Sequence, residues 1–249
     1  MKTKAKKIKK MVRKGYAKIA ITNGNCCGSS SCCAGGASAE ELSQIVGYSN
    51  SEIKAVPAGA NLGLGCGNPV ALASLRAGET VLDLGSGAGF DAFLASIKVG
   101  KKGKIIGVDM TPEMVAKAKA NAKKGSYKNI EFRLGEIENL PVADDTIDAI
   151  ISNCVINLSP DKQAVFNESF RVLKSGGRIM VSDLVLEKKL PPKIKRSVEA
   201  YVGCIAGASM KKDYLAFIKQ AGFKKIEVVA SDRYLDYPVV SIKVKAIKS

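Results

Sequence analysis

Apolar and polar positions along the second part of the chain follow a pattern typical of an α/β protein. From residue 80 onward, short apolar runs rich in β-branched residues alternate with longer stretches whose apolar positions recur at helical spacing. We predict strands over 80–84, 104–109, 130–134, 147–153 and 177–184, and helices over 90–98, 112–124 and 162–173. This alternation indicates a Rossmann-like parallel sheet with helices on both faces. Residues 223–230 and 239–246 alternate apolar and polar side chains and predict an antiparallel pair at the C-terminal edge.

The segments outside this core predict a basic helix, a loop and an insertion. Residues 1–20 carry apolar side chains at helical spacing among many lysines, which predicts a basic amphipathic helix packed on the domain. We predict a further helix over 38–56, a short helix over 70–75 and broken helical structure over 185–222. The expected division is an N-terminal part over 1–61, a core over 62–184, and an insertion with the closing strands over 185–249.

The most distinctive stretch joins the first predicted strand to the first predicted helix. It covers residues 81–91, with glycines at 85, 87 and 89. A strand, a glycine turn and a helix N-terminus together bring bare backbone close to a bound small molecule. The spacing differs from the Gly-x-Gly-x-x-Gly fingerprint of dinucleotide-binding proteins, and an ordinary glycine-rich turn is the alternative interpretation. The stretch resembles the first motif of class I methyltransferases that use S-adenosylmethionine (SAM).

Polar and flexible residues stand at the carboxyl ends of the first four predicted strands, where open α/β sheets bind ligands. Asp109 follows Gly85 by 24 residues, near the roughly 20-residue interval at which an acid reaches a ribose diol. No lysine or arginine lies between Gly85 and Asp91, which favours SAM over a phosphate-rich cofactor such as NAD(P). The candidate cofactor-binding residues are Asp83, Gly85, Ser86, Gly87, Asp109, Met110, Glu136, Ile137 and Asn153.

Composition excludes several function classes. The chain of 249 residues is 46% hydrophobic, which is enough for a sizeable core. No apolar run approaches the roughly 18 residues of a membrane span, so we expect a cytoplasmic protein that does not contact the membrane. The formal net charge is +16, but the lysines are spread along the chain with few aromatic residues among them, which argues against nucleic-acid binding. The complete lack of histidine excludes a histidine base and removes the commonest metal ligand.

The seven cysteines form two groups. An odd number argues against a disulfide framework, and a reducing compartment favours thiol chemistry. Four of them form the pairs Cys26–Cys27 and Cys32–Cys33 in a loop rich in glycine and serine, with a spacing that does not match a zinc knuckle. The other three are Cys66, Cys154 and Cys204, each predicted in a loop. A single free cysteine is commonly a small buried apolar residue, whereas three in loops that can converge above the strand ends indicate a substrate site.

Four segments together resemble the arsenite methyltransferase family: 65–69, 83–91, 152–158 and 203–208. The likeness extends over nearly the whole chain. It implies that SAM donates a methyl group to As(III) held by the thiolates of Cys66, Cys154 and Cys204, a reaction of arsenic detoxification. It further implies a thiol reductant such as glutathione or thioredoxin.

The chemistry of these residues is compatible with the implied reaction. Thiolates are soft ligands that suit As(III), and an attacking lone pair that carries no proton needs no general base. Two alternatives stay open. In the first, the chain is a SAM-dependent methyltransferase of another small molecule and the cysteines are structural. In the second, it is a metalloid-binding protein without catalytic activity.

Overall fold

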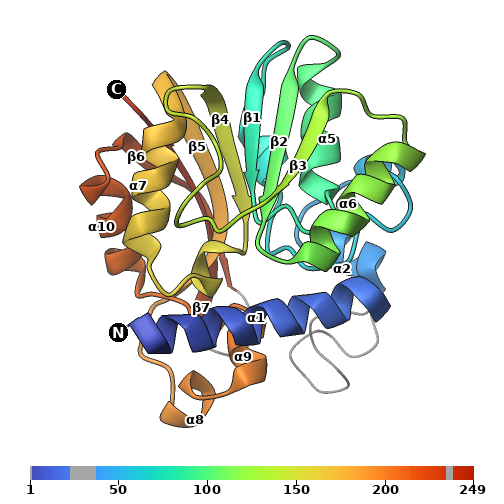
Figure 1. The fold of residues 1–249 in the computed structure, drawn as a ribbon. Coiled ribbons are helices and arrows are strands. Elements are labelled where there is room, and N and C mark those ends of the chain that lie inside the picture. The colour runs from blue at the N-terminus through green and yellow to red at the C-terminus, as the bar shows by residue number, and fades with distance from the viewer. Residues whose placement is uncertain (1, 23–37, 234–237) are drawn as a thin grey trace.

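A single mixed sheet organises the molecule. The structure is a computed structural model that describes residues 2–22, 38–233 and 238–249. Within these residues the sheet has seven strands in the order β3-β2-β1-β4-β5-β7-β6 (Figure 1). The strands are β1 Thr80–Leu84, β2 Lys104–Asp109, β3 Ile130–Leu134, β4 Ile147–Asn153, β5 Leu173–Leu186, β6 Lys224–Arg233 and β7 Val239–Ile247. The first five pair in parallel, and β7 runs antiparallel to both of its neighbours. The predicted parallel sheet with an antiparallel C-terminal edge is confirmed.

Helices cover both faces of this sheet (Figure 1). They are α1 Lys2–Thr22, α2 Ala39–Ile45, α3 Asn50–Ala55, α4 Pro69–Leu72, α5 Phe90–Val99, α6 Pro112–Lys124, α7 Lys162–Val172, α8 Pro192–Lys195, α9 Val198–Val202 and α10 Lys211–Gln220, with a 3-10 turn, η1, at Ile156–Leu158. Leu82 of β1 packs in one core with Phe166 of α7 and Tyr214 of α10. Its neighbour Val81 packs in a second core with Phe93 of α5. Successive side chains of a strand point to opposite faces, so a continuous apolar strand supplies both cores.

The prediction of one helix over 38–56 is wrong in one respect, because the structure has two helices there, α2 and α3. Gly47 between them has φ +105°, a conformation that glycine adopts readily. Ser49 then begins α3 with a capping box in which its side chain and that of Glu52 satisfy backbone N–H groups at the start of the helix. The predicted helix over 70–75 is shorter as well: α4 ends at Leu72, shortly before Ser74 at φ +47°.

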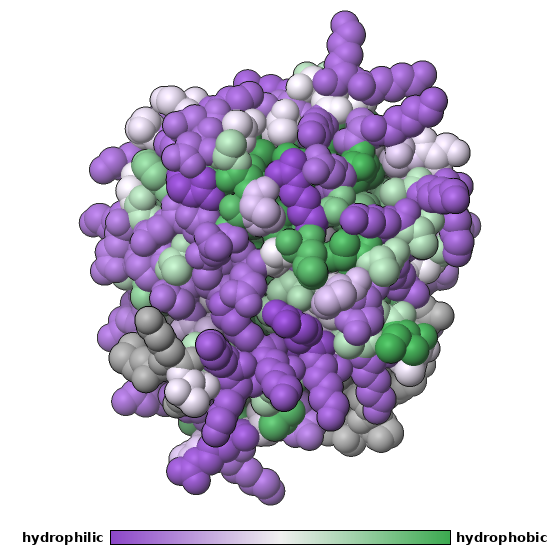
Figure 2. Space-filling view, viewed as in Figure 1, coloured by the Kyte–Doolittle hydropathy of each residue, from purple (hydrophilic) through white to green (hydrophobic). Residues whose placement is uncertain are grey.

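Helix α1 lies across one end of the sheet, below the strands in the view of Figure 1. Its apolar residues Val12 and Ile19 are buried, and it contacts α6 and α9. Hydrophilic side chains cover most of the molecular face drawn in Figure 2, in keeping with the many lysines of the chain. None of the helices in the described part of the chain has both the length and the apolar character that crossing a membrane requires.

Candidate functional site

The site begins at the turn between β1 and α5. Gly85, Gly87 and Gly89 all have positive φ, at +66°, +51° and +98°, where a side chain would cost about 1–2 kcal/mol per residue. The turn is held against β2, since the Gly87 N–H donates to Asp109 Oδ2 over 3.0 Å. Strand β1 lies between β2 and β4, which is the point where strand order reverses. The glycine turn therefore opens into the crevice in which such sheets bind ligands.

Three carboxyl groups surround this turn, those of Asp83 and Asp91, which are buried, and that of Asp109, which is half-buried. Burial and the neighbouring charges of Asp91 and Asp109 raise the pKa of Asp83 well above its usual range. Burial also raises the pKa of Asp109, and it raises that of Asp91 to about 6. Asp83 Oδ2 and Ser86 Oγ have no hydrogen-bond partner among the described residues. Because an unsatisfied buried polar atom is costly, these two atoms are suited to bond a polar ligand.

A buried hydrogen-bond network connects the glycine turn to the loop that carries Cys66. Tyr48 Oη donates to Asp91 Oδ1 over 2.5 Å. Asn153 Nδ2 donates to Tyr48 Oη, to the Gly67 carbonyl and to Asp91 Oδ2 over 2.8–3.0 Å. Its Oδ1 accepts the N–H of Cys66 over 2.9 Å. Asn153 thus holds the cysteine loop in place at the end of β4. No sequence pattern pointed to Tyr48, whereas Asp91 lies within the glycine stretch and could have been singled out there.

A pocket with about 1070 Å³ of empty space, part of it open to solvent, lies over these strand ends. Eight of the nine predicted cofactor-binding residues line it: Asp83, Gly85, Ser86, Gly87, Asp109, Met110, Ile137 and Asn153. Glu136 lies outside the lining, and Glu138 lines the pocket in its place. Cys154 also lines this pocket, so one predicted arsenic ligand borders the predicted cofactor site.

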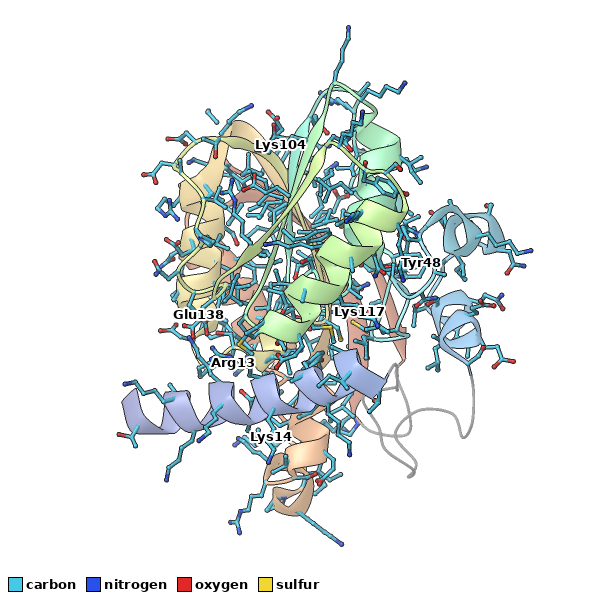
Figure 3. The ribbon with its side chains drawn as sticks, turned by 45° about the vertical axis from the view of Figure 1, so that its right-hand side comes forward. Arg13, Lys14, Tyr48, Lys104, Lys117 and Glu138 are labelled. Atoms are coloured by element: carbon cyan, nitrogen blue, oxygen red, sulfur yellow. The ribbon has the colours of Figure 1, made fainter. Side chains whose placement is uncertain are left out.

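The basic helix α1 covers the pocket, which the sequence had not indicated. Lys9, Val12 and Tyr16 are among the lining residues. Lys9 Nζ pairs with Glu136 Oε2 over 2.7 Å and with Glu138 Oε1 over 3.2 Å. Figure 3 shows Glu138 just above α1, close to Arg13 of the helix. These ion pairs hold α1 against the loop that follows β3.

The three cysteines outside the N-terminal pairs lie together in one apolar cluster, and all three are buried and unbridged. The Cys154 thiol hydrogen-bonds with Cys204 and Cys66, and these bonds, together with burial, raise its pKa well above the usual value. Burial raises the pKa of the Cys66 thiol as well. The Cys204 thiol donates to the Cys154 carbonyl over 2.7 Å. The pairs Cys26–Cys27 and Cys32–Cys33 lie outside the described residues.

The backbone around this cluster is unusual. Cys154 and Cys204 have φ +57° and +66°, in the left-handed region that non-glycine residues rarely adopt. Strained conformations of this kind concentrate at ligand sites, where the surrounding structure enforces them. Cys66 is flanked by two glycines at close approaches, since a Cβ on Gly65 would stand 2.5 Å from Asn153 Nδ2 and one on Gly67 would overlap Ser182 Oγ. The fold therefore gathers three thiols at the expense of local conformational freedom.

Asp183 of β5 borders this cluster and was not predicted. One of its carboxylate oxygens lies with Sγ of Cys66 and Sγ of Cys154 in a group whose atoms are all within 4.8 Å of one another. Burial raises the pKa of Asp183 to about 7. The residue stands at the carboxyl end of the fifth predicted strand, so the rule that singled out the first four strand ends could have found it.

Comparison with known proteins agrees with this geometry. A protein family described as "Methyltransferase domain" matches residues 75–222, which is more than half of the chain. The chain belongs to this methyltransferase family. All nine predicted cofactor-binding residues lie within the matched segment. Cys154 lies within it as well, whereas Cys66 precedes the segment.

Several relatives of this methyltransferase domain are named arsenite methyltransferase. An arsenite methyltransferase of Halobacterium salinarum is 46% identical over 237 residues, which cover 92% of this chain and 60% of the relative. An arsenite methyltransferase of Aquipseudomonas alcaligenes is 38% identical over 166 residues, 47% of its length. The chain thus spans about half to three fifths of these relatives. The crystal structure of an arsenic(III) S-adenosylmethionine methyltransferase from Chlamydomonas reinhardtii superposes with a TM-score of 0.68 at 31% identity, covering 83% of this chain and 73% of that one.

Proposed function

We propose that this methyltransferase domain binds SAM in the pocket over the strand ends and methylates As(III) held by Cys66, Cys154 and Cys204. The observation that carries the proposal is the cluster of three buried thiols, one of which, Cys154, lines that pocket. The relatives named arsenite methyltransferases add support, and the one from Halobacterium salinarum matches 92% of this chain. The thiols require a reducing compartment, so we propose that the protein acts in the cytoplasm.

The residues of the pocket suit SAM. The unpartnered Asp83 Oδ2 offers an acceptor to a ligand ammonium group, and the open space beside Gly87 leaves room for a close approach. Asp109 accepts the Gly87 N–H with Oδ2 and the Thr111 N–H with Oδ1, so its carboxylate is fixed at the end of β2 where a ribose diol would bond it. Met110 and Ile137 supply apolar surface for an adenine ring. Val12 and Tyr16 of α1 would exclude water from the bound cofactor.

Arsenic ligation follows from the thiol cluster. Sulfur is the preferred ligand of a soft, thiophilic centre, and three thiolates leave the lone pair of As(III) free. The hydroxides of arsenous acid can take up the three thiol protons and leave as water, so the raised thiol pKa values do not require a separate base. The positive φ of Cys154 and Cys204 directs two of the ligands from adjacent loops toward one point.

The role of the protein in the transfer is alignment and desolvation. When bound, SAM supplies an electrophilic methyl carbon on a positively charged sulfur, which the arsenic lone pair can attack. The transfer leaves arsenic oxidised by two electrons. Two thiols that join in a disulfide return these electrons, and the hydrogen-bonded pair Cys66 and Cys154 is suited to this step. An external thiol such as glutathione or thioredoxin then reduces the disulfide.

The test is incubation of the protein with SAM, As(III) and a thiol, followed by arsenic speciation. We expect methylated arsenic with the wild type and none with Cys66→Ser, Cys154→Ser or Cys204→Ser. The matched control replaces Cys26, Cys27, Cys32 and Cys33 by serine together and is expected to retain methylation. If the Cys154→Ser protein still consumes SAM with another small molecule, the cysteines are structural and the proposal is wrong. Binding of As(III) without methylated product would instead indicate a metalloid-binding protein.

A further inference from the structure

The tightest group of metal-ligating atoms in the described residues is not the three cysteines. It consists of Sγ of Cys66, Sγ of Cys154 and a carboxylate oxygen of Asp183, all within 4.8 Å of one another and all buried. The Cys204 thiol donates a hydrogen bond to the Cys154 carbonyl and does not belong to this group. Two sulfurs and one carboxylate are a ligand set for a borderline divalent cation rather than for As(III), which prefers sulfur.

We propose that Cys66, Cys154 and Asp183 form a site for a thiophilic divalent cation of the zinc class, which competes with As(III) for the two shared thiols. The site is distinct from the three-cysteine arsenic site because it uses the carboxylate in place of Cys204. It does not depend on SAM.

The carboxylate has the lone pair that the site requires. Asp183 Oδ1 accepts hydrogen bonds from Asn157 Nδ2 over 2.8 Å and from the Leu184 N–H over 3.0 Å. Among the described residues, Oδ2 accepts one hydrogen bond, from Tyr214 Oη over 3.1 Å. An oxygen of this kind accepts two bonds, so Oδ2 can add a cation without losing its partner. The hydrogen bonds fix the carboxylate in place, as outer partners do for metal ligands.

The geometry needs only a small contraction. Ligand atoms of a tetrahedral zinc site stand roughly 3.6–3.8 Å apart, because Zn–S bonds are about 2.3 Å and Zn–O bonds about 2.1 Å. The present limit of 4.8 Å exceeds this by about an ångström. Rotation of the thiols can close that gap. Cys154 also lines the pocket over the strand ends, which gives the cation a route from solvent.

The charges balance as well. Binding breaks two S–H bonds and forms two metal–sulfur bonds, and the protons leave to solvent. Two thiolates and one carboxylate then exceed the charge of a divalent cation by one negative unit. Lys162, which is partly buried and interacts electrostatically with Asp183 and Cys204, offsets that excess.

The test titrates the reduced 249-residue chain with Co²⁺, whose thiolate charge-transfer absorption reports sulfur ligation, and then displaces it with Zn²⁺. Cys26, Cys27, Cys32 and Cys33 are serine in every sample, so that they contribute no signal. As(III) binding is measured on the same proteins by equilibrium dialysis. The variants are Asp183→Asn and Cys204→Ser, which each remove one ligand from only one of the two proposed sets.

We expect the two variants to separate the two ligands. Asp183→Asn should weaken Co²⁺ and Zn²⁺ binding at least about tenfold and leave As(III) binding nearly unchanged. Cys204→Ser should weaken As(III) binding and leave Co²⁺ and Zn²⁺ binding nearly unchanged. The proposal is overturned if the parent protein binds no Co²⁺, if Asp183→Asn binds it as the parent does, or if Cys204→Ser loses both ligands together. Loss of both ligands in Asp183→Asn would show that the carboxylate only holds the cysteines in place, and would overturn it too. Failure of arsenic methylation leaves these cation measurements readable, so the two proposals can fail separately.

Discussion

A methyl group added at Gly67 tests whether the close approach of the Cys66 loop to β5 builds the thiol cluster. In Gly67→Ala the new Cβ would overlap Ser182 Oγ and would stand 3.0 Å from Ser182 Cβ and 3.1 Å from Lys243 Cε. Ser182 is buried, so the loop rather than the strand has to move. Overpacking of this kind costs about 1–3 kcal/mol. The movement carries the Cys66 thiol away from Ser182 and Cys154, its neighbours in the cluster.

Urea unfolding and As(III) dialysis measure the two consequences. We expect Gly67→Ala to lower the free energy of unfolding by about 1–3 kcal/mol and to weaken As(III) binding roughly tenfold. Gly203→Ala is the matched control, because it lies beside Cys204 and the nearest atom to its new Cβ is 3.3 Å away. It should change neither quantity strongly.

A second-site change makes the explanation specific. Ser182→Ala removes the oxygen that the new methyl group overlaps, so the double variant should recover part of the lost stability. A double-mutant cycle should then give a coupling of about 1 kcal/mol between the two positions. Purely additive effects, or a Gly67→Ala protein with wild-type stability and As(III) affinity, would refute the steric reasoning.

Three further predictions concern the core and the pocket. The Asp91 pKa of about 6 lies above the usual 3.8, so ionisation penalises the folded state by up to about 3 kcal/mol above pH 6, and the penalty vanishes below about pH 4. Between pH 4 and pH 7 the free energy of unfolding should therefore fall less for Asp91→Asn than for the wild type. Parallel pH profiles of the two proteins would contradict this. Burial opposes ionisation of Glu79, but the hydrogen bonds and charge of Arg178 prevail and lower its pKa. Glu79→Gln should thus cost about 1–3 kcal/mol at pH 7 and progressively less as the pH falls below 4.5; a cost that does not depend on pH would count against the ion pair. Gly87→Ala should weaken SAM binding roughly tenfold by calorimetry, since its new methyl group enters open pocket space at φ +51°; unchanged affinity would mean that the cofactor does not approach this turn.

The sequence by itself determined the sheet and the glycine turn. The bounds of β1 to β4 agree with the predicted strands. For β1, β2 and β4 the reason is that largely apolar runs flanked by turn residues bury both faces as central parallel strands. The three glycines predicted a sharp turn, and in the structure all three have a positive φ that few other residues tolerate. Their predicted places in loops singled out Cys66, Cys154 and Cys204, the family resemblance implied their role, and the fold places all three in one cluster.

Only the tertiary structure decided what surrounds these residues. Asn153 joins Tyr48, Asp91 and the Cys66 loop, although more than a hundred positions separate Asn153 from Tyr48. Helix α1 closes the pocket from the far N-terminal end of the chain, and its Lys9 pairs with Glu136, which lies outside the lining. The physical reason is that periodicity and turn chemistry are local, whereas a buried polar contact depends on which strand ends the sheet order brings together.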